Sequence, residues 1–210
     1  MLTVHHLGVS QSERIVWLCE ELGIAYDLKR YDRVPPGRGL GPPEYKALHP
    51  LGTAPIITDG DVVLPESGAI MQYIMGRYGD GGLAPAPQDA DFADYLFWFH
   101  FTNASMLPAA GRAPRDEADQ SPMAQFMRAR AAAPWTMIET QLGKTPYLAG
   151  QRFTAADIIM VFNLTTMRAF APKDLSGYPN ILAYLQRIGA RPAYQRAMQK
   201  ADPQMSPMLT

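Results

Sequence analysis

The chain has 210 residues, of which 19 are Lys or Arg and 20 are Asp or Glu, so its formal net charge at pH 7 is −1. This length allows one large domain or two small ones, with a substantial buried core. No basic stripe that could neutralise phosphates is visible, so we expect no nucleic-acid partner. The single cysteine, Cys19, excludes an internal disulfide and any Cys-x-x-Cys redox or zinc motif.

The apolar segments do not indicate a membrane protein. The N-terminus lacks a charged stretch followed by a long apolar run, so it does not resemble a signal peptide. The longest uncharged run, residues 95–111, contains polar side chains and Pro108, whereas a membrane span needs about 20 mainly apolar residues. We therefore expect a buried core helix here, no membrane association, and a soluble, cytoplasmic protein.

The first 79 residues predict an alternation of strands and helices. Apolar residues recur with a period of two in the predicted strands and at helical spacing in the predicted helices. Asp59-Gly60 between two apolar runs is typical of a hairpin turn. In chain order, the pattern predicts a strand at 2–6, a helix at 12–22, a strand at 25–31, a loop rich in Pro and Gly at 35–43, a hairpin at 54–64 and a helix at 66–79.

The rest of the chain predicts helices only. Residues 80–89 are rich in Gly and Pro and indicate a linker. Beyond it, helical periodicity is interrupted by Pro, Gly or polar breaks, which predicts helices at 90–111, 122–142, 154–170, 179–189 and 192–200. The sequence therefore predicts an α/β domain over 1–79, a linker at 80–89 and an all-helical domain over 90–210.

Two stretches carry a resemblance to a known family. Residues 49–70, HPLGTAPIITDGDVVLPESGAI, resemble the glutathione-binding core of the cytosolic glutathione S-transferases. Residues 10–28, SQSERIVWLCEELGIAYDL, resemble their first turn, first helix and second strand. The resemblance extends over the whole length and is closest to bacterial and fungal members of the serine-type branch, which includes the theta and phi classes. It implies a thioredoxin-like domain followed by a helical bundle domain.

The resemblance also implies an activity. Members of this family conjugate the glutathione thiolate to small hydrophobic electrophiles in detoxification. It further implies a homodimer and glutathione as co-substrate, with no metal or bound organic cofactor. Two alternatives stay open: another glutathione-dependent reaction (isomerisation, ether cleavage, dehalogenation or peroxide reduction), or a non-catalytic regulator or ligand-binding protein of the same fold. The family's glutathione-binding residues favour an enzyme.

Four residues match the part of the family motif that binds glutathione. The resemblance implies that the Ala54-Pro55 bond is cis and that the Ala54 backbone binds the cysteinyl part of glutathione as an added strand would. It also implies that Glu66 accepts from the γ-glutamyl ammonium and that Ser67, at a helix N-terminus, binds the γ-glutamyl carboxylate. The alternative for Glu66 and Ser67 is a capping role in the first helical turn.

Two further positions depart from the family pattern. Thr53 stands where relatives often carry Lys or Gln, so its short hydroxyl offers less charge to the ligand. In the loop 35–43, where relatives often place basic residues toward the glycyl carboxylate, Arg38 is the only cation. We include both among the expected glutathione-binding residues.

Ser10 and Ser12 are the candidates for stabilising the thiolate. Ser10 lies four residues before Arg14, the spacing at which serine-type relatives carry their catalytic serine. Ser10 and Glu13 also fit a capping box, in which the hydroxyl would accept from the backbone instead. Ser12 lies just inside the predicted helix, which favours a capping or solvated role. Activation of the thiol by backbone N–H groups alone is the third possibility.

The resemblance places one wall of the electrophile pocket on the first helix of the second domain. The candidate side chains on this helix are Tyr95, Trp98, Phe99, Thr102 and Met106. Because they occupy several faces of one helix, the alternative for many of them is a place in the core. Cys19 lies on the apolar face of its helix, which predicts packing. Thr154 and Asp157 have the spacing of a capping box at the start of a buried helix.

Overall fold

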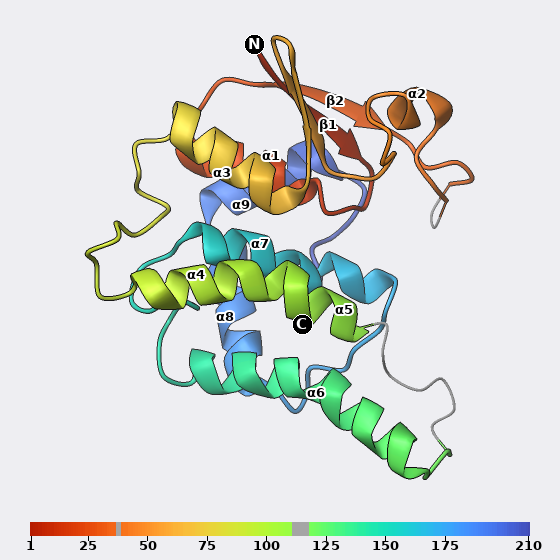
Figure 1. Ribbon diagram of the computed structural model, residues 1–210, viewed down its shortest axis with the longest axis vertical. Coiled ribbons are helices and arrows are strands. Elements are labelled where there is room, and N and C mark those ends of the chain that lie inside the picture. Colours follow the sequence, from red (N-terminus) through yellow and green to blue (C-terminus); the bar gives the residue numbers. More distant parts are fainter. Residues whose placement is uncertain (37–38, 111–117) are drawn as a thin grey trace.

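The computed structural model describes residues 1–36, 39–110 and 118–210 (Figure 1). Its first part contains a mixed sheet with the strand order β2-β1-β3-β4. The central strand β1 runs parallel to β2 and antiparallel to β3, which pairs antiparallel with β4. The strands are β1 (Leu2–Leu7), β2 (Asp27–Tyr31), β3 (Ile56–Asp59) and β4 (Val62–Pro65). This is the thioredoxin-like arrangement that the family resemblance implies.

Two helices of this part connect the sheet to the helical part. Helix α1 (Glu13–Leu22) contacts β1, α3, α7 and α9. Its apolar side chains from Ile15 to Cys19 are buried, and Gly23 ends it in the left-handed conformation with φ +62°, which glycine adopts without strain. Helix α3 (Ser67–Tyr78) lies beside α1 on the side of the sheet that faces the helical part (Figure 1). A short helix, α2 (Pro43–Lys46), lies outside this arrangement.

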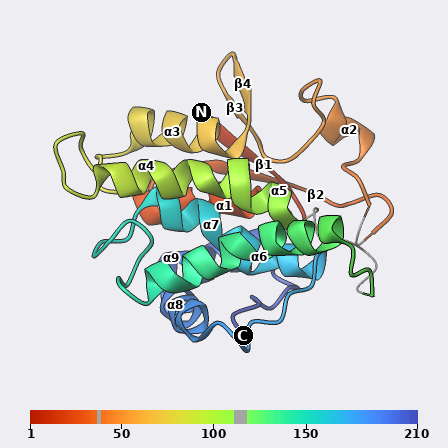
Figure 2. The ribbon, with the colours of Figure 1, turned by 60° about the horizontal axis from the view of Figure 1, so that its bottom comes forward.

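The second part consists of helices around α7. Helix α7 (Ala155–Leu164) is buried at every position, because α1, α3 and α4 all contact it. Figure 2 brings α6 and α8 forward, at the end of the molecule away from the sheet. The helical elements are α4 (Phe92–Phe101), the π-helical turn η1 (Thr102–Met106), α5 (Leu107–Ala110), α6 (Pro122–Leu142), α7, the 3-10 turn η2 (Thr166–Ala169), α8 (Pro179–Gly189) and α9 (Pro192–Ala201). One hydrophobic core runs through both parts.

The predicted helices at 122–142 and 179–189 agree with the structure, but two others are broken. The helix expected over 90–111 widens at η1, just before Pro108, whose ring nitrogen cannot donate a helical hydrogen bond. The helix expected over 154–170 ends at Leu164, since Thr165 has non-helical backbone angles (φ −123°, ψ −98°), and the Thr165 hydroxyl donates to the Val161 carbonyl at 2.7 Å. The sequence also did not predict α2.

The capping box at the start of α7 is confirmed. The Ala156 N–H donates to Thr154 Oγ1 at 3.3 Å, and the Thr154 N–H donates to Asp157 Oδ2 at 2.9 Å. Asp157 Oδ1 also accepts from the Leu148 N–H at 3.0 Å and from the Tyr184 hydroxyl at 3.1 Å. This carboxylate therefore fixes the start of the central helix to its neighbours. Cys19 is buried in the core, as its place on the helix predicts.

Candidate functional site

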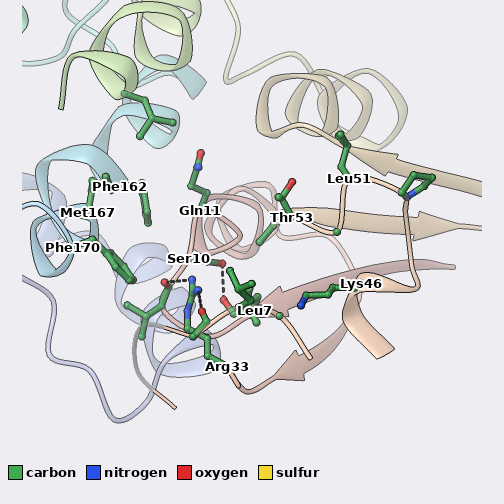
Figure 3. A pocket seen from close by; sticks show the side chains of 18 residues that line it. Leu7, Ser10, Gln11, Arg33, Lys46, Leu51, Thr53, Phe162, Met167 and Phe170 are labelled. Atoms are coloured by element: carbon green, nitrogen blue, oxygen red, sulfur yellow. Dashed lines mark hydrogen bonds between the residues drawn. The ribbon is translucent and has the colours of Figure 1, made fainter. Parts of the chain in front are cut away.

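A cleft of about 680 Å³ opens between the two parts of the molecule (Figure 3). Its wall on the sheet side comes from the β1–α1 turn, the residues around 40 and the residues 50–54. Its wall on the helical side comes from α5, α7 and η2. The lining residues are Leu7, Val9, Ser10, Gln11, Arg33, Gly39, Leu40, Gly41, Lys46, Pro50, Leu51, Gly52, Thr53, Ala54, Leu107, Phe162, Met167 and Phe170.

Ser10 lies in the turn between β1 and α1 and faces this cleft (Figure 3). Its side chain is 5% exposed, and its hydroxyl donates to the Leu7 carbonyl at 2.6 Å. Its Oγ also lies 2.7 Å from Ser12 Oγ. The turn reaches this position through Val9, which has φ +49°, an uncommon conformation for a β-branched residue. Ser10 is thus held with its oxygen at the border between cleft and interior.

Ser12 occupies a different place, although it is only two residues away. It is fully buried, and its Oγ lies 2.8 Å from His6 Nδ1 and accepts from the Leu7 N–H at 3.2 Å. Ser12 is the N-cap residue of α1, but its hydroxyl makes no capping hydrogen bond and is not solvated, so neither role expected for this hydroxyl is observed. The capping box of Ser10 and Glu13 does not form either, since the Glu13 carboxylate accepts from the Thr166 hydroxyl at 2.7 Å instead.

Arg33 supports the turn that carries Ser10. Its Nε donates to the Gly8 carbonyl at 2.8 Å and its Nη2 to the Val9 carbonyl at 2.9 Å. Its Nη1 donates to the Gly39 carbonyl at 2.7 Å (Figure 3). The guanidinium therefore joins both loops at this end of the cleft. No local sequence pattern indicates this role of Arg33, because the role depends on contacts with distant backbone carbonyls.

The predicted glutathione-binding residues fall into two groups. Thr53 and Ala54 line the cleft, and the Ala54-Pro55 bond is cis, as the resemblance implies. Glu66 immediately precedes α3 with φ +73°, and Ser67 begins that helix; neither lines the cleft. Arg38 lies outside the described residues. Lys46, at the end of α2, is an exposed cation on the cleft wall that the sequence did not single out.

A buried arginine connects Ser67 to the cleft. Arg14 Nη1 donates to Ser67 Oγ at 3.2 Å, to Gln11 Oε1 at 2.6 Å and to Asn103 Oδ1 at 3.2 Å. Ser67 is 2% exposed, whereas Gln11 lines the cleft. Burial lowers the pKa of Arg14 to about 9, although the neighbouring Glu13 opposes this shift. A positive group therefore lies directly behind the N-terminus of α3.

The five residues predicted to form the electrophile pocket do not line this cleft. Tyr95, Trp98, Phe99, Thr102 and Met106 are all buried, and four of them belong to the hydrophobic core. The helical wall is formed by Leu107, Phe162, Met167 and Phe170 instead. Phe162 lies near the end of α7, and the last two lie in and just after η2, where the predicted helix is broken. A continuous helical pattern could not indicate that these side chains turn toward the first part.

Glu13 gives the protein a testable pH dependence. Burial raises the pKa of Glu13 to about 8, even though the Thr166 hydroxyl donates to it. Because the folded pKa lies above the unfolded value, the contribution of Glu13 to stability is present at low pH and is lost as the pH rises toward 8. We expect the free energy of unfolding of the wild type to fall by about 1 kcal/mol relative to that of Glu13→Gln between pH 6 and 7.

Urea unfolding of both proteins at several pH values measures this difference. Gln keeps the acceptor for Thr166 but does not titrate, so other ionisable groups cancel in the comparison. Parallel pH profiles for the two proteins would contradict the assignment.

Comparisons with known proteins agree with this geometry. Residues 5–82 match the family model described as glutathione S-transferase, N-terminal domain, and residues 92–192 match that of the C-terminal domain. Glutathione S-transferase 3 of Schizosaccharomyces pombe is 32% identical over 96% of this chain and 88% of its own. Among the described residues, every helix is too short or too polar to span a bilayer.

Solved structures support the same relationship. A glutathione S-transferase from Actinobacillus pleuropneumoniae superposes with a TM-score of 0.84 and 34% identity, covering 98% of this chain and 97% of that one. A theta class glutathione S-transferase from Xanthomonas axonopodis pv. citri, with glutathione bound, gives a TM-score of 0.69 and 27% identity over 93% and 96% of the two chains. The chain therefore belongs to the glutathione S-transferase family and is an enzyme of that family.

Proposed function

We propose that this transferase conjugates glutathione to small hydrophobic electrophiles and that the Ser10 hydroxyl stabilises the thiolate. The observation that carries the proposal is that Ser10 lines the cleft, whereas Ser12 is fully buried. Ser10 also lies in the turn three residues before the first residue of α1, so the partial positive charge of that helix N-terminus favours an anion nearby. A hydroxyl and a helix N-terminus together favour the thiolate over the thiol.

The glutathione backbone is proposed to extend from Ser10 in two directions. The N–H and C=O of Ala54, beside the cleft, are the partners for the cysteinyl part. Glu66 and Ser67 are the partners for the γ-glutamyl ammonium and carboxylate, and the buried Arg14 behind Ser67 adds positive charge for that carboxylate. Thr53 and Lys46 border the cleft near α2, where Lys46 is the cation for the glycyl carboxylate. Arg38, outside the described residues, is a second candidate cation by the family resemblance.

The electrophile is proposed to bind against the helical wall. Leu107, Phe162, Met167 and Phe170 offer apolar and polarisable surface across the cleft from the residues proposed for glutathione. This replaces the wall expected on α4, whose aromatic side chains are buried in the core. Because the wall is apolar, it favours small hydrophobic electrophiles over charged ones.

Met167→Ala is expected to change the preference among electrophiles by several fold, because the truncation removes apolar contact with the electrophile. Glutathione affinity should stay within about threefold, because glutathione is proposed to bind the opposite wall of the cleft. Met106 provides the matched control, because it is a methionine of the core. Met106→Ala should lower the melting temperature and leave the preference unchanged. If Met167→Ala lowered only the melting temperature, the wall assignment would be wrong.

The assembly and location are also proposals. The family supports a homodimer and a cytoplasmic protein, and we retain the division into a glutathione-binding domain (1–79), a linker (80–89) and an electrophile-binding domain (90–210).

Calorimetric titration with glutathione, followed by a panel of an aryl halide, an activated alkene and an organic hydroperoxide, tests the function. Binding together with turnover of the aryl halide or the alkene supports conjugation. Turnover of the hydroperoxide alone would favour the peroxidase alternative. Absence of binding at millimolar glutathione would favour a regulator of the same fold.

A further inference from the structure

A chain of polar side chains leads from the cleft into the interior behind Ser10. Ser10 Oγ lies 2.7 Å from Ser12 Oγ, and Ser12 Oγ lies 2.8 Å from His6 Nδ1. His6 Nε2 lies 3.1 Å from Asp202 Oδ2, in the segment that follows α9. Ser10 is at the border of the cleft, while Ser12 and His6 are fully buried. We call these four residues the Ser10 relay.

The carboxylate at the inner end sets the direction of the hydrogen bonds. Burial alone would raise the pKa of Asp202, but the hydrogen bonds from His6 and the Val9 N–H, with nearby positive charge, hold it below its usual value. An ionised carboxylate only accepts, so His6 Nε2 carries the proton toward Asp202. In neutral imidazole, Nδ1 is then an acceptor, and Ser12 donates to it.

The charged groups around Asp202 come from several elements. Arg30 from β2 and Arg33 after it attract the carboxylate, whereas the buried Glu13 of α1 repels it only when ionised, at pH values near or above its raised pKa of about 8. The Val9 N–H donates to Asp202 Oδ1 at 2.9 Å, so the same carboxylate also holds the turn that carries Ser10.

The two hydroxyls complete the connection to the cleft. Ser12 Oγ accepts from the Leu7 N–H at 3.2 Å and donates to His6, which leaves one lone pair for the Ser10 hydroxyl. The Ser10 proton, which is donated to the Leu7 carbonyl at 2.6 Å, turns to Ser12 Oγ at 2.7 Å when the relay operates. Ser10 Oγ can in turn accept from a group in the cleft, as it already does from the Ser12 N–H at 3.3 Å. Each hydroxyl can therefore pass a proton inward: it donates its own proton to the next group in the relay and accepts one from the group on the cleft side.

We propose that His6 accepts the proton that leaves the glutathione thiol, an inference that rests on the proposed role of Ser10. The S–H bond breaks and its proton moves to Ser10 Oγ. The Ser10 proton moves to Ser12 Oγ, and the Ser12 proton moves to His6 Nδ1. The products are a thiolate in the cleft and an imidazolium beside the Asp202 carboxylate. The hydrogen bonds from His6 Nδ1 through Ser12 to Ser10 then all point toward the sulfur, so Ser10 becomes the donor that stabilises the thiolate.

The first test counts protons when glutathione binds to the wild type. Calorimetric titration in two buffers with different ionisation enthalpies measures the protons released, and the ultraviolet absorbance of the thiolate measures how much of it forms. The relay predicts that the number of protons released to the buffer is clearly smaller than the number of thiolates formed. Release of one proton for each thiolate formed would overturn the proposal.

The second test interrupts the relay at two places. His6→Asn and Ser12→Ala should each raise the pKa of the bound thiol by about one unit, a tenfold change in the ratio of thiolate to thiol. Any thiolate that still forms should then release its proton to the buffer. The affinity for S-methylglutathione, which has no thiol proton, should not change. Ser12→Ala alone decides the question if His6→Asn does not fold.

His5→Asn is the matched control for His6→Asn. His5 is also buried on β1, but its ring nitrogens lie 2.9 Å from the Tyr31 hydroxyl and 3.1 Å from Thr58 Oγ1, away from the relay. This variant should leave the pKa of the bound thiol and the proton count as they are in the wild type. An equal shift in His5→Asn and His6→Asn would overturn the relay.

Ser10→Ala separates the two proposals. If it leaves the pKa of the bound thiol unchanged, the role of Ser10 fails and the relay fails with it. If it raises that pKa while His6→Asn and Ser12→Ala do not, the relay alone is overturned.

Discussion

Ser10→Ala is expected to raise the pKa of the bound glutathione thiol by one unit or more and to lower kcat/KM at pH 7 about tenfold to hundredfold. A free thiol with a pKa near 8.5 is only about 3% ionised at pH 7, and a downward shift of about two units, worth ~2.7 kcal/mol, makes the thiolate predominant. Ser10 is the serine whose oxygen borders the cleft, so its loss removes a hydrogen bond from the thiolate.

The pH dependence of kcat/KM for conjugation measures this effect. Ser10→Ala loses the hydrogen bonds of its hydroxyl to the Leu7 carbonyl and to Ser12, but Ser10 borders the cleft, where water can replace a lost partner. Its free energy of unfolding should therefore stay within about 1 kcal/mol of the wild type. Ser121 is the matched control, because its Oγ accepts from the Ala124 N–H at 3.2 Å as the N-cap of α6. Ser121→Ala should lower stability and leave the thiol pKa unmoved; the same pattern in Ser10→Ala would transfer the role away from Ser10.

Ser67→Ala is expected to weaken glutathione binding by about tenfold to hundredfold, because losing a hydrogen bond to a charged group costs about 1.5–3 kcal/mol. The affinity for S-methylglutathione should fall by the same factor, since the contact lies away from the sulfur. The pKa of the bound thiol should not move. Isothermal titration with both ligands measures these effects.

Stability serves as the control for this variant. Arg14 keeps Gln11 and Asn103 as partners when the Ser67 hydroxyl is removed, so only a small loss of stability is expected. Unchanged affinity for both ligands would refute the placement of the γ-glutamyl group at Ser67.

The local elements of the fold could be predicted because their signals lie within a few neighbouring residues. Helical spacing, Gly23 at the end of α1 and the Thr154–Asp157 capping box all act inside one turn or element. Pro108 alone could not predict the break at η1, because a proline in a helix can also produce a kink. Helix α2 is a single turn, too short to show a period.

The site could be predicted only in part. Ser10 and Ser12 lie in one turn, so spacing alone cannot tell which hydroxyl borders the cleft. Which hydroxyl is drawn into the interior depends on the contact between His6 and Asp202, which are 196 residues apart in the chain. The apolar wall likewise depends on how η2 turns Met167 toward the sheet side, a tertiary contact that no local pattern encodes.

The double contact of Asp202 has a consequence for biosynthesis. The carboxylate that holds both the Val9 N–H and the His6 ring comes from a segment translated after α9. During translation, the sheet and α1 can form early, but the turn that carries Ser10 acquires this support only when the last helix and the residues after it have left the ribosome. The nascent thioredoxin-like part therefore lacks the carboxylate that fixes its serine, and the finished site is a property of the whole chain.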